Sequence, residues 1–223
     1  MKTPTHLLLL ALSLGGLSCS GSVPVDHEEH DFEDGEDVDL GTQPWRERRR
    51  MDVDQLEASL REVTGGIGWE RMNGDGTVRT RYFREYADTL GMPDYINSSA
   101  EDLSVSLLFQ KFLDDAARSA CRRVADREAG DGPSYEAEPQ GTFAPVDLTS
   151  ETPPTQAEID AALAALLLRF HGRRVDVASP ELEPWRALEA RLQAAATETE
   201  APPKRAWEGV CVALITHPDF YTY

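Results

Sequence analysis

Cysteine is scarce in this sequence, and its scarcity excludes covalently attached haem. The 223-residue chain holds three cysteines, Cys19, Cys121 and Cys211. Covalent haem needs two cysteines two residues apart and an adjacent histidine, which these three cannot supply. The Gly-x-Ser-x-Gly elbow and the glycine-rich phosphate loop are also missing from the sequence. We therefore expect no cofactor, and these absences favour a non-catalytic protein over an enzyme.

Basic charge is the second shortage. Lysine and arginine total 22 against 40 aspartate and glutamate residues, a formal net charge of −18. Such a chain repels nucleic-acid phosphates and anionic lipid head groups. We therefore expect no nucleic-acid partner. Either a basic partner or simple solubility accounts for the excess of carboxylates.

Long apolar runs are lacking except near the N-terminus. Lys2 precedes one such run, residues 7–17, which is too short to span a bilayer and has the length of a signal-peptide core. No other run approaches 18 apolar residues. The pattern predicts a signal peptide over residues 1–18 and an exported protein.

The segment Gly16-Leu17-Ser18-Cys19 resembles the lipobox of bacterial lipoproteins. That resemblance implies that Cys19 becomes the lipidated first residue and carries palmitate. It also implies, from Ser20, a lipid anchor in the outer membrane, facing the periplasm or the exterior. Plain secretion with cleavage near Ser20 or Ser22 is the alternative.

An acidic stretch follows the predicted anchor. Nine carboxylates lie between Asp26 and Asp39, and like charges this dense keep a chain extended. We assign residues 19–50 to a lipidated acidic tether and residues 51–223 to one folded domain, and we expect residues 20–44 of the tether to be disordered.

Helical spacing of apolar residues dominates the folded part, which predicts an all-α domain of about six helices. Asn73-Gly74-Asp75-Gly76 is a turn signal and leaves room for one small hairpin. Ser98–Glu101 and Thr155–Glu158 have the form of capping boxes. The expected helices cover residues 54–63, 82–90, 98–127, 156–171, 180–196 and about 203–216.

No metal site is expected. A calcium-loop register through the turn would put Arg71 and Tyr82 at positions that require carboxylates. His27 and His30 lie among carboxylates and could collect cations only weakly. His171 and His217 fall at predicted helix C-termini, where the helix dipole favours an imidazolium.

Cys121 and Cys211 are predicted to form a disulfide. Lipidation would consume Cys19, which leaves an even number of cysteines in an oxidising compartment. Each of the two lies on the apolar stripe of its predicted helix. Two buried free thiols are the alternative.

Two segments show a family resemblance. Residues 206–220 (AWEGVCVALITHPDF) and 154–159 (PTQAEI) resemble the domains of unknown function of planctomycete and myxobacterial cytochrome-associated proteins. Residues 86–124 are similar to a myxobacterial exported lipoprotein, and the first two segments cover the C-terminal third. The resemblance implies a helical fold and a place beside an exported redox or hydrolase protein.

Taken together, the patterns predict a non-catalytic cell-envelope lipoprotein. It would be a binding or assembly component, attached to the membrane through its lipid anchor and able to meet an exported protein partner. The alternative is an envelope enzyme with a carboxylate-based site, since acidic residues are plentiful. A deep pocket with converging titratable groups would favour the enzyme, and an exposed apolar patch would favour the partner protein.

Overall fold

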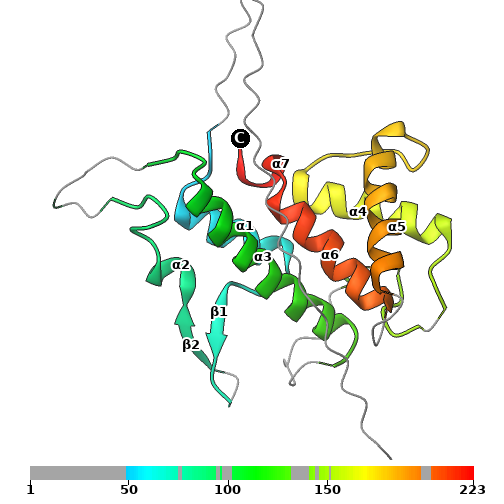
Figure 1. Ribbon diagram of the computed structural model, residues 1–223, viewed down its shortest axis with the longest axis horizontal. Coiled ribbons are helices and arrows are strands. Elements are labelled where there is room, and N and C mark those ends of the chain that lie inside the picture. Colours follow the sequence, from blue (N-terminus) through cyan, green and yellow to red (C-terminus); the bar gives the residue numbers. More distant parts are fainter. Residues whose placement is uncertain are drawn as a thin grey trace, which may run out of the picture. The chain divides into compact units, whose positions relative to one another are not determined.

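The computed structural model describes residues 49–74, 77–93, 96, 102–131, 141–143, 146–150, 152–196 and 202–223. Within them the fold is mostly helical with one two-stranded hairpin, which confirms the predicted all-α class (Figure 1). The predicted signal peptide, the lipidation site at Cys19 and most of the tether lie outside the described residues. The elements are α1 (Val53–Val63), β1 (Glu70–Met72), β2 (Val78–Arg81), α2 (Tyr82–Glu85), α3 (Leu107–Glu128), α4 (Gln156–His171), the 3-10 turn η1 (Pro180–Leu182), α5 (Glu183–Ala196), α6 (Pro202–Thr216) and α7 (Pro218–Tyr221).

The first half of the domain follows its local signals closely. Asp52 caps α1 by accepting a hydrogen bond from the Gln55 backbone amide, and the Gln55 side chain accepts one in return. The predicted hairpin is present as antiparallel β1 and β2. The helix expected over residues 82–90 is shorter, because α2 ends at Glu85 and turns lead on to Gly91.

The start expected for the long helix was wrong. The capping box at Ser98–Glu101 lies outside the described residues, and residues 102–106 are not helical. α3 instead begins at Leu107, because the Ser106 side chain accepts a hydrogen bond from the Phe109 backbone amide. The helix then runs 22 residues and buries one stripe of its surface.

In the C-terminal half, the helices begin and end at residues that the local capping signals indicate. The Thr155–Glu158 capping box opens α4 as predicted, and Gly172 ends it with φ of 64°. Ser179 caps η1, which leads directly into α5. Pro184 is the second residue of α5, where its missing amide hydrogen costs no helical bond.

α6 is the centre of the packing. It lies against α3 on one side and α5 on the other (Figure 1). Trp207, Val210 and Leu214 are fully buried, and burial of each contributes roughly 1.5–3 kcal/mol. His217 and Pro218 were expected only to end this helix, but His217 also caps the short α7.

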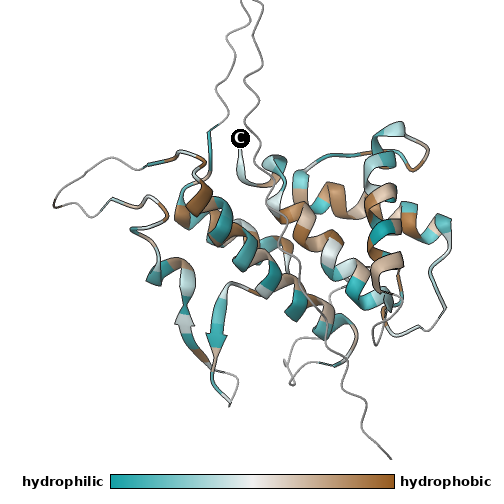
Figure 2. Cartoon of the chain, viewed as in Figure 1, coloured by the Kyte–Doolittle hydropathy of each residue, from teal (hydrophilic) through white to brown (hydrophobic). Residues whose placement is uncertain are grey.

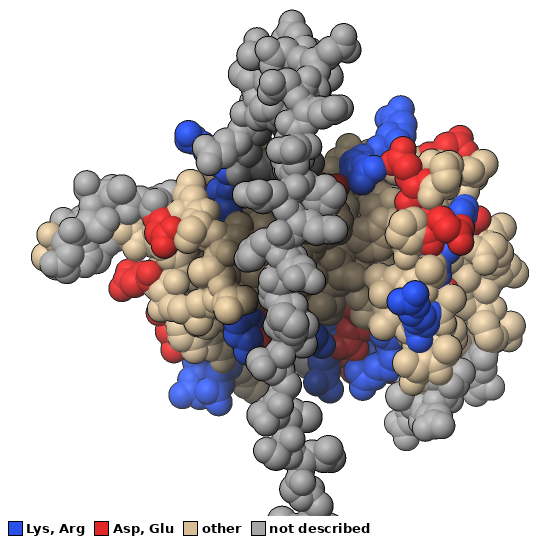
Figure 3. Space-filling view, turned by 45° about the horizontal axis from the view of Figure 1, so that its top comes forward, with Lys and Arg blue, Asp and Glu red and all other residues tan. Residues whose placement is uncertain are grey.

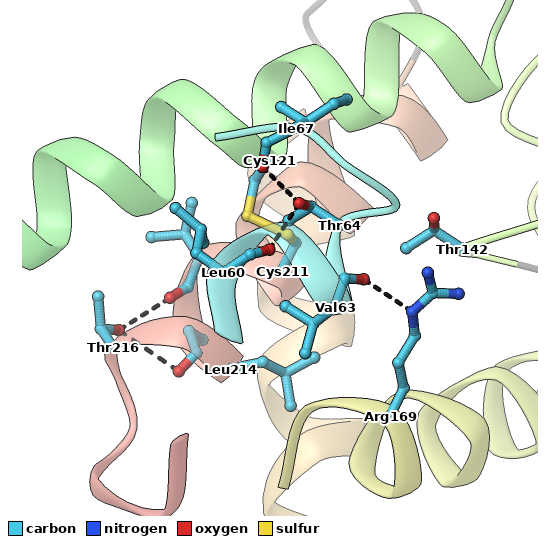
Figure 4. Close-up of a disulfide and its surroundings, with 12 residues drawn as sticks. Leu60, Val63, Thr64, Ile67, Cys121, Thr142, Arg169, Cys211, Leu214 and Thr216 are labelled. Carbon is cyan, nitrogen blue, oxygen red and sulfur yellow. Dashed lines mark hydrogen bonds between the residues drawn. A yellow bond between two sulfur atoms is a disulfide. The ribbon is translucent and has the colours of Figure 1, made fainter. Parts of the chain in front are cut away.

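A disulfide joins the two helices that share most of this core. Cys121 of α3 and Cys211 of α6 are bonded, with Cα atoms 5.7 Å apart and both residues fully buried (Figure 4). The predicted pairing is therefore present. Thr64 lies beside the bond and donates its hydroxyl to the Leu60 and Ile67 carbonyls, which ties the end of α1 to the same region.

The start and the end of the domain pair with each other. The Met51 backbone amide donates a hydrogen bond to the Tyr221 carbonyl at 2.8 Å. The backbones of Arg50 and Thr222 form an isolated antiparallel β-bridge. Arg50 is 2% exposed, and its guanidinium lies 4.3 Å from the centre of the Phe109 ring. Arg50, which we assigned to the tether, thus belongs to the folded domain.

Among the described residues, no helix is both long enough and apolar enough to cross a membrane.

Candidate functional site

Apolar side chains are exposed where α3 begins. Leu107 is 90% exposed, and Val105 and Leu108 are each about half exposed. Among the described residues, five of the eight exposed large hydrophobic side chains fall between residues 78 and 108. Figure 2 shows the hydrophobic colour at the first turn of α3. We call Val105, Leu107 and Leu108 the α3 apolar surface.

A row of aromatic rings continues from this surface toward the hairpin. Leu108 and Phe112 lie one turn apart on the same face of α3. The Phe112 ring stacks on Tyr86 at 4.9 Å between ring centres, and Tyr86 stacks on Tyr82 at 6.0 Å. These three rings are only partly buried, and Trp69 supports all of them from beneath at 5.3–6.0 Å. The aromatic row thus extends the exposed apolar area.

Arginines border the aromatic row. Arg71, Arg79 and Arg81 of the hairpin are exposed and form no ion pair within the described part of the chain. Basic side chains lie along the lower edge of the face drawn in Figure 3, on the side where the hairpin lies. In this otherwise acidic protein, the hairpin carries a local excess of positive charge.

A second group of functional side chains comes from the ends of α4 and α6. His171 is the last residue of α4, and His217 and Asp219 begin α7. One ligand atom from each of these three residues lies within 4.8 Å of the others. The two imidazole rings stack at 5.0 Å, and Trp185 of α5 lies 5.7 and 5.8 Å from them. We call His171, His217 and Asp219 the histidine cluster.

The protonation of His171 follows from its surroundings. Burial lowers the pKa of its imidazole, and this effect outweighs the hydrogen bond to the Leu214 carbonyl, which acts in the opposite direction. That carbonyl can only accept, so Nε2 carries the proton and donates it at 2.9 Å. The expectation of a dipole-stabilised imidazolium at this helix end is corrected, since burial favours the neutral ring.

His217 also differs from its expected role. It was placed at a helix C-terminus, but its Nδ1 accepts a hydrogen bond from the Asp219 backbone amide at 3.1 Å and so caps the N-terminus of α7. The same Nδ1 lies 3.8 Å from the Asp219 carboxylate. Arg173 holds this carboxylate at 3.3 Å and also pairs with Glu181.

The histidine cluster opens to solvent on one side. His171, Arg173 and Asp219, together with Thr222 and Tyr223, line a pocket of about 510 Å³. A small molecule or a coordinated water can therefore reach the cluster. Sequence reasoning missed this group because 46 residues separate His171 from His217, and only the packing of α4 against α6 and α7 brings them together.

One buried carboxylate bears on the enzyme alternative. Glu189 of α5 is 3% exposed, and burial raises its pKa. It shares a face of α5 with Leu192, which packs against Gly209 of α6. Glu189 thus lies within the helix packing, one turn of α5 after Trp185.

Comparisons with known proteins found no match: no family profile, no curated protein and no solved structure matches the chain.

Proposed function

We propose that this protein is a non-catalytic lipoprotein of the cell envelope that binds an exported protein partner through the α3 apolar surface. The observation that carries the proposal is the exposure of Leu107 and Leu108 at the head of the partly exposed aromatic row. The N-terminal sequence supports export and attachment through Cys19.

The composition of this surface is that of a protein interface. Exposed leucines at the start of a helix lose contact with water when a partner covers them, which stabilises a complex. Tyrosine and arginine are enriched at the centres of interfaces, and tyrosine offers a large apolar area with few rotatable bonds. The aromatic row and the hairpin arginines supply both residue types.

The surface also indicates the chemistry of its partner. The centre is apolar and the hairpin side is basic, with Arg79 and Arg81 exposed. A complementary partner presents an apolar patch bordered by carboxylates. Electrostatic attraction at the border mainly raises the association rate, while the apolar centre supplies most of the affinity.

Attachment to the membrane is tested by cell fractionation. Cys19→Ala removes the residue that would be lipidated, so the variant should move from the membrane fraction to the soluble envelope fraction. If the variant still sediments with membranes after a high-salt wash, the lipid anchor is wrong.

Partner binding is tested by affinity purification from solubilised membranes, with a matched pair of variants. Leu108 and Leu168 are 48% and 47% exposed, so Leu108→Asp and Leu168→Asp replace equally exposed leucines. Leu108 lies in the first turn of α3 and Leu168 in the last turn of α4, where the helix dipole disfavours an aspartate, so circular dichroism must establish that both variants are folded. Only Leu108 belongs to the α3 apolar surface. We expect Leu108→Asp to lose a partner, identified by mass spectrometry, that the parent protein and Leu168→Asp both retain. Equal recovery with all three proteins would place the binding surface elsewhere.

A further inference from the structure

We propose that the histidine cluster binds a divalent transition-metal ion of the zinc class. The ligands are the imidazoles of His171 and His217 and the carboxylate of Asp219, which lie within 4.8 Å of one another. Two imidazoles and one carboxylate suit zinc, cobalt and nickel, whereas calcium and magnesium favour oxygen ligands. This site is separate from the α3 apolar surface, and neither proposal depends on the other.

The strongest observation is the state of His171. Its Nδ1 is buried and has no hydrogen-bond partner among the residues that the structure describes, although its Nε2 donates to the Leu214 carbonyl. Metal-bound histidines show this arrangement, in which one nitrogen donates to a backbone carbonyl and the other offers its lone pair to the ion. The orphaned nitrogen therefore gains a partner when an ion binds.

The other two ligands are held beside it. The His217 Nδ1 is 3.8 Å from the Asp219 carboxylate, close to the spacing of about 3.3 Å between ligands on a tetrahedral zinc ion with bonds of about 2.0–2.1 Å. When the ion binds, the His217 Nδ1 gives up the hydrogen bond that it accepts from the Asp219 amide and coordinates the ion instead. His217 and Asp219 are two positions apart at the start of α7, so one local segment supplies both ligands.

The charge around the cluster suits a cation. Arg173 contributes one positive charge, while Asp219 and Glu181 contribute two negative charges. These three side chains together carry a net charge of −1. Three protein ligands also leave a coordination position facing the pocket, where water or a small anion can bind.

Zinc binding is measured by titration calorimetry on the mature full-length chain with the other metal-binding residues replaced. Five histidines occur in the sequence; His6 lies in the predicted signal peptide. Cys19→Ala, His27→Ala and His30→Ala therefore leave His171 and His217 as the remaining histidines. We expect this parent protein to bind one zinc ion per chain.

Asp219→Asn and His217→Ala should weaken zinc binding at least about tenfold. Asp176→Asn is the control: it removes an equal charge from an exposed loop residue of the same region and should leave the affinity unchanged. Circular dichroism establishes that each variant is folded. Unchanged affinity in both ligand variants, or no stoichiometric binding in the parent, would overturn the site.

Trp185 gives a second readout that is independent of affinity. Its ring lies within 6 Å of both histidine rings, so bound cobalt(II) or nickel(II) should quench its fluorescence. Cobalt(II) should also produce the intense visible bands of a four- or five-coordinate complex. Trp185→Phe should abolish the quenching and keep the visible bands. Quenching that survives in Trp185→Phe, or only the weak bands of hydrated cobalt, would contradict binding at this cluster.

Discussion

Breaking the Cys121–Cys211 bond should lower the free energy of unfolding by about 4.5 kcal/mol. The bond links residues 90 positions apart, and closing a loop of that length restricts the unfolded chain by about this amount at 25 °C. Domains of this size have a total stability of roughly 5–15 kcal/mol. The reduced protein should therefore retain only a small margin of stability.

The comparison is cleanest within a single protein. A Cys19→Ala variant, oxidised or reduced, keeps both buried sulfur atoms, so the packing of α3 against α6 changes little. Urea denaturation should give a lower midpoint for the reduced form. The urea dependence of its unfolding free energy should be steeper, because the reduced unfolded chain is more expanded. Non-reducing peptide mapping of envelope-derived protein verifies the bond itself.

Two results would refute this reasoning. Oxidised and reduced forms that differ by less than about 1 kcal/mol would mean that the unfolded chain is already compact or that the helices separate without the bond mattering. Recovery of both cysteines as alkylated free thiols without prior reduction would mean that the bond is not formed in the cell.

Gly91, Glu189 and the acidic tether each give a further prediction. Gly91→Ala should lower the free energy of unfolding, measured in urea melts, by more than about 2 kcal/mol, because φ is 95° and a Cβ would lie 2.1 Å from the Asp102 carbonyl oxygen. Gly172→Ala is the control, since Gly172 also has a positive φ, of 64°, but has open space around it. It should lower the free energy of unfolding by about 1 kcal/mol. Equal costs would contradict the role of that contact. Glu189→Gln should raise the free energy of unfolding at neutral pH, because burial raises the pKa of the Glu189 carboxyl and the folded state therefore disfavours its charged form. This increase should shrink as the pH falls and the carboxyl becomes protonated. An increase that does not depend on pH would show that charge is not the cause. Limited proteolysis should remove residues 20–44 and leave a core that begins near Arg49, and a protease-resistant tether would contradict its predicted disorder.

Local signals in the sequence predicted much of the fold. The capping box at Thr155 and the glycine at position 172 act over a few residues, so α4 has the predicted ends. The disulfide was also predictable, because apolar stripes on two helices of one core must face each other. The ends of α4 depend on interactions within a few residues, and the disulfide followed from the two cysteines that remain after Cys19.

The errors arose where several local signals compete. Ser98 and Ser106 both precede a helical pattern, and the structure uses Ser106 to start α3. Arg50 was assigned to the acidic tether, but it is buried against Phe109 and its guanidinium donates a hydrogen bond to the Leu90 carbonyl at 2.9 Å. A single sequence does not reveal such partners, because they depend on how distant segments pack.

The candidate sites were the least predictable part. His171 and His217 were considered separately, each at the end of its own helix, and the sequence contains no short motif that joins them. Their proximity results from the crossing of α4 and α6, as does the orphaned Nδ1 of His171. The exposure of Leu107 and Leu108 was not predicted either, because both lie inside the helix expected over residues 98–127 and the sequence does not show where its packing begins.

Site-specific photo-crosslinking in living cells tests the proposed function most directly. A photoreactive amino acid at position 107 samples the centre of the α3 apolar surface, and the same amino acid at position 168 samples an exposed site on α4. We predict a discrete adduct with one exported protein at position 107 that is missing at position 168. No protein adduct at position 107, the same adducts at both positions, or an adduct only with lipid or with a second copy of this chain would contradict the account.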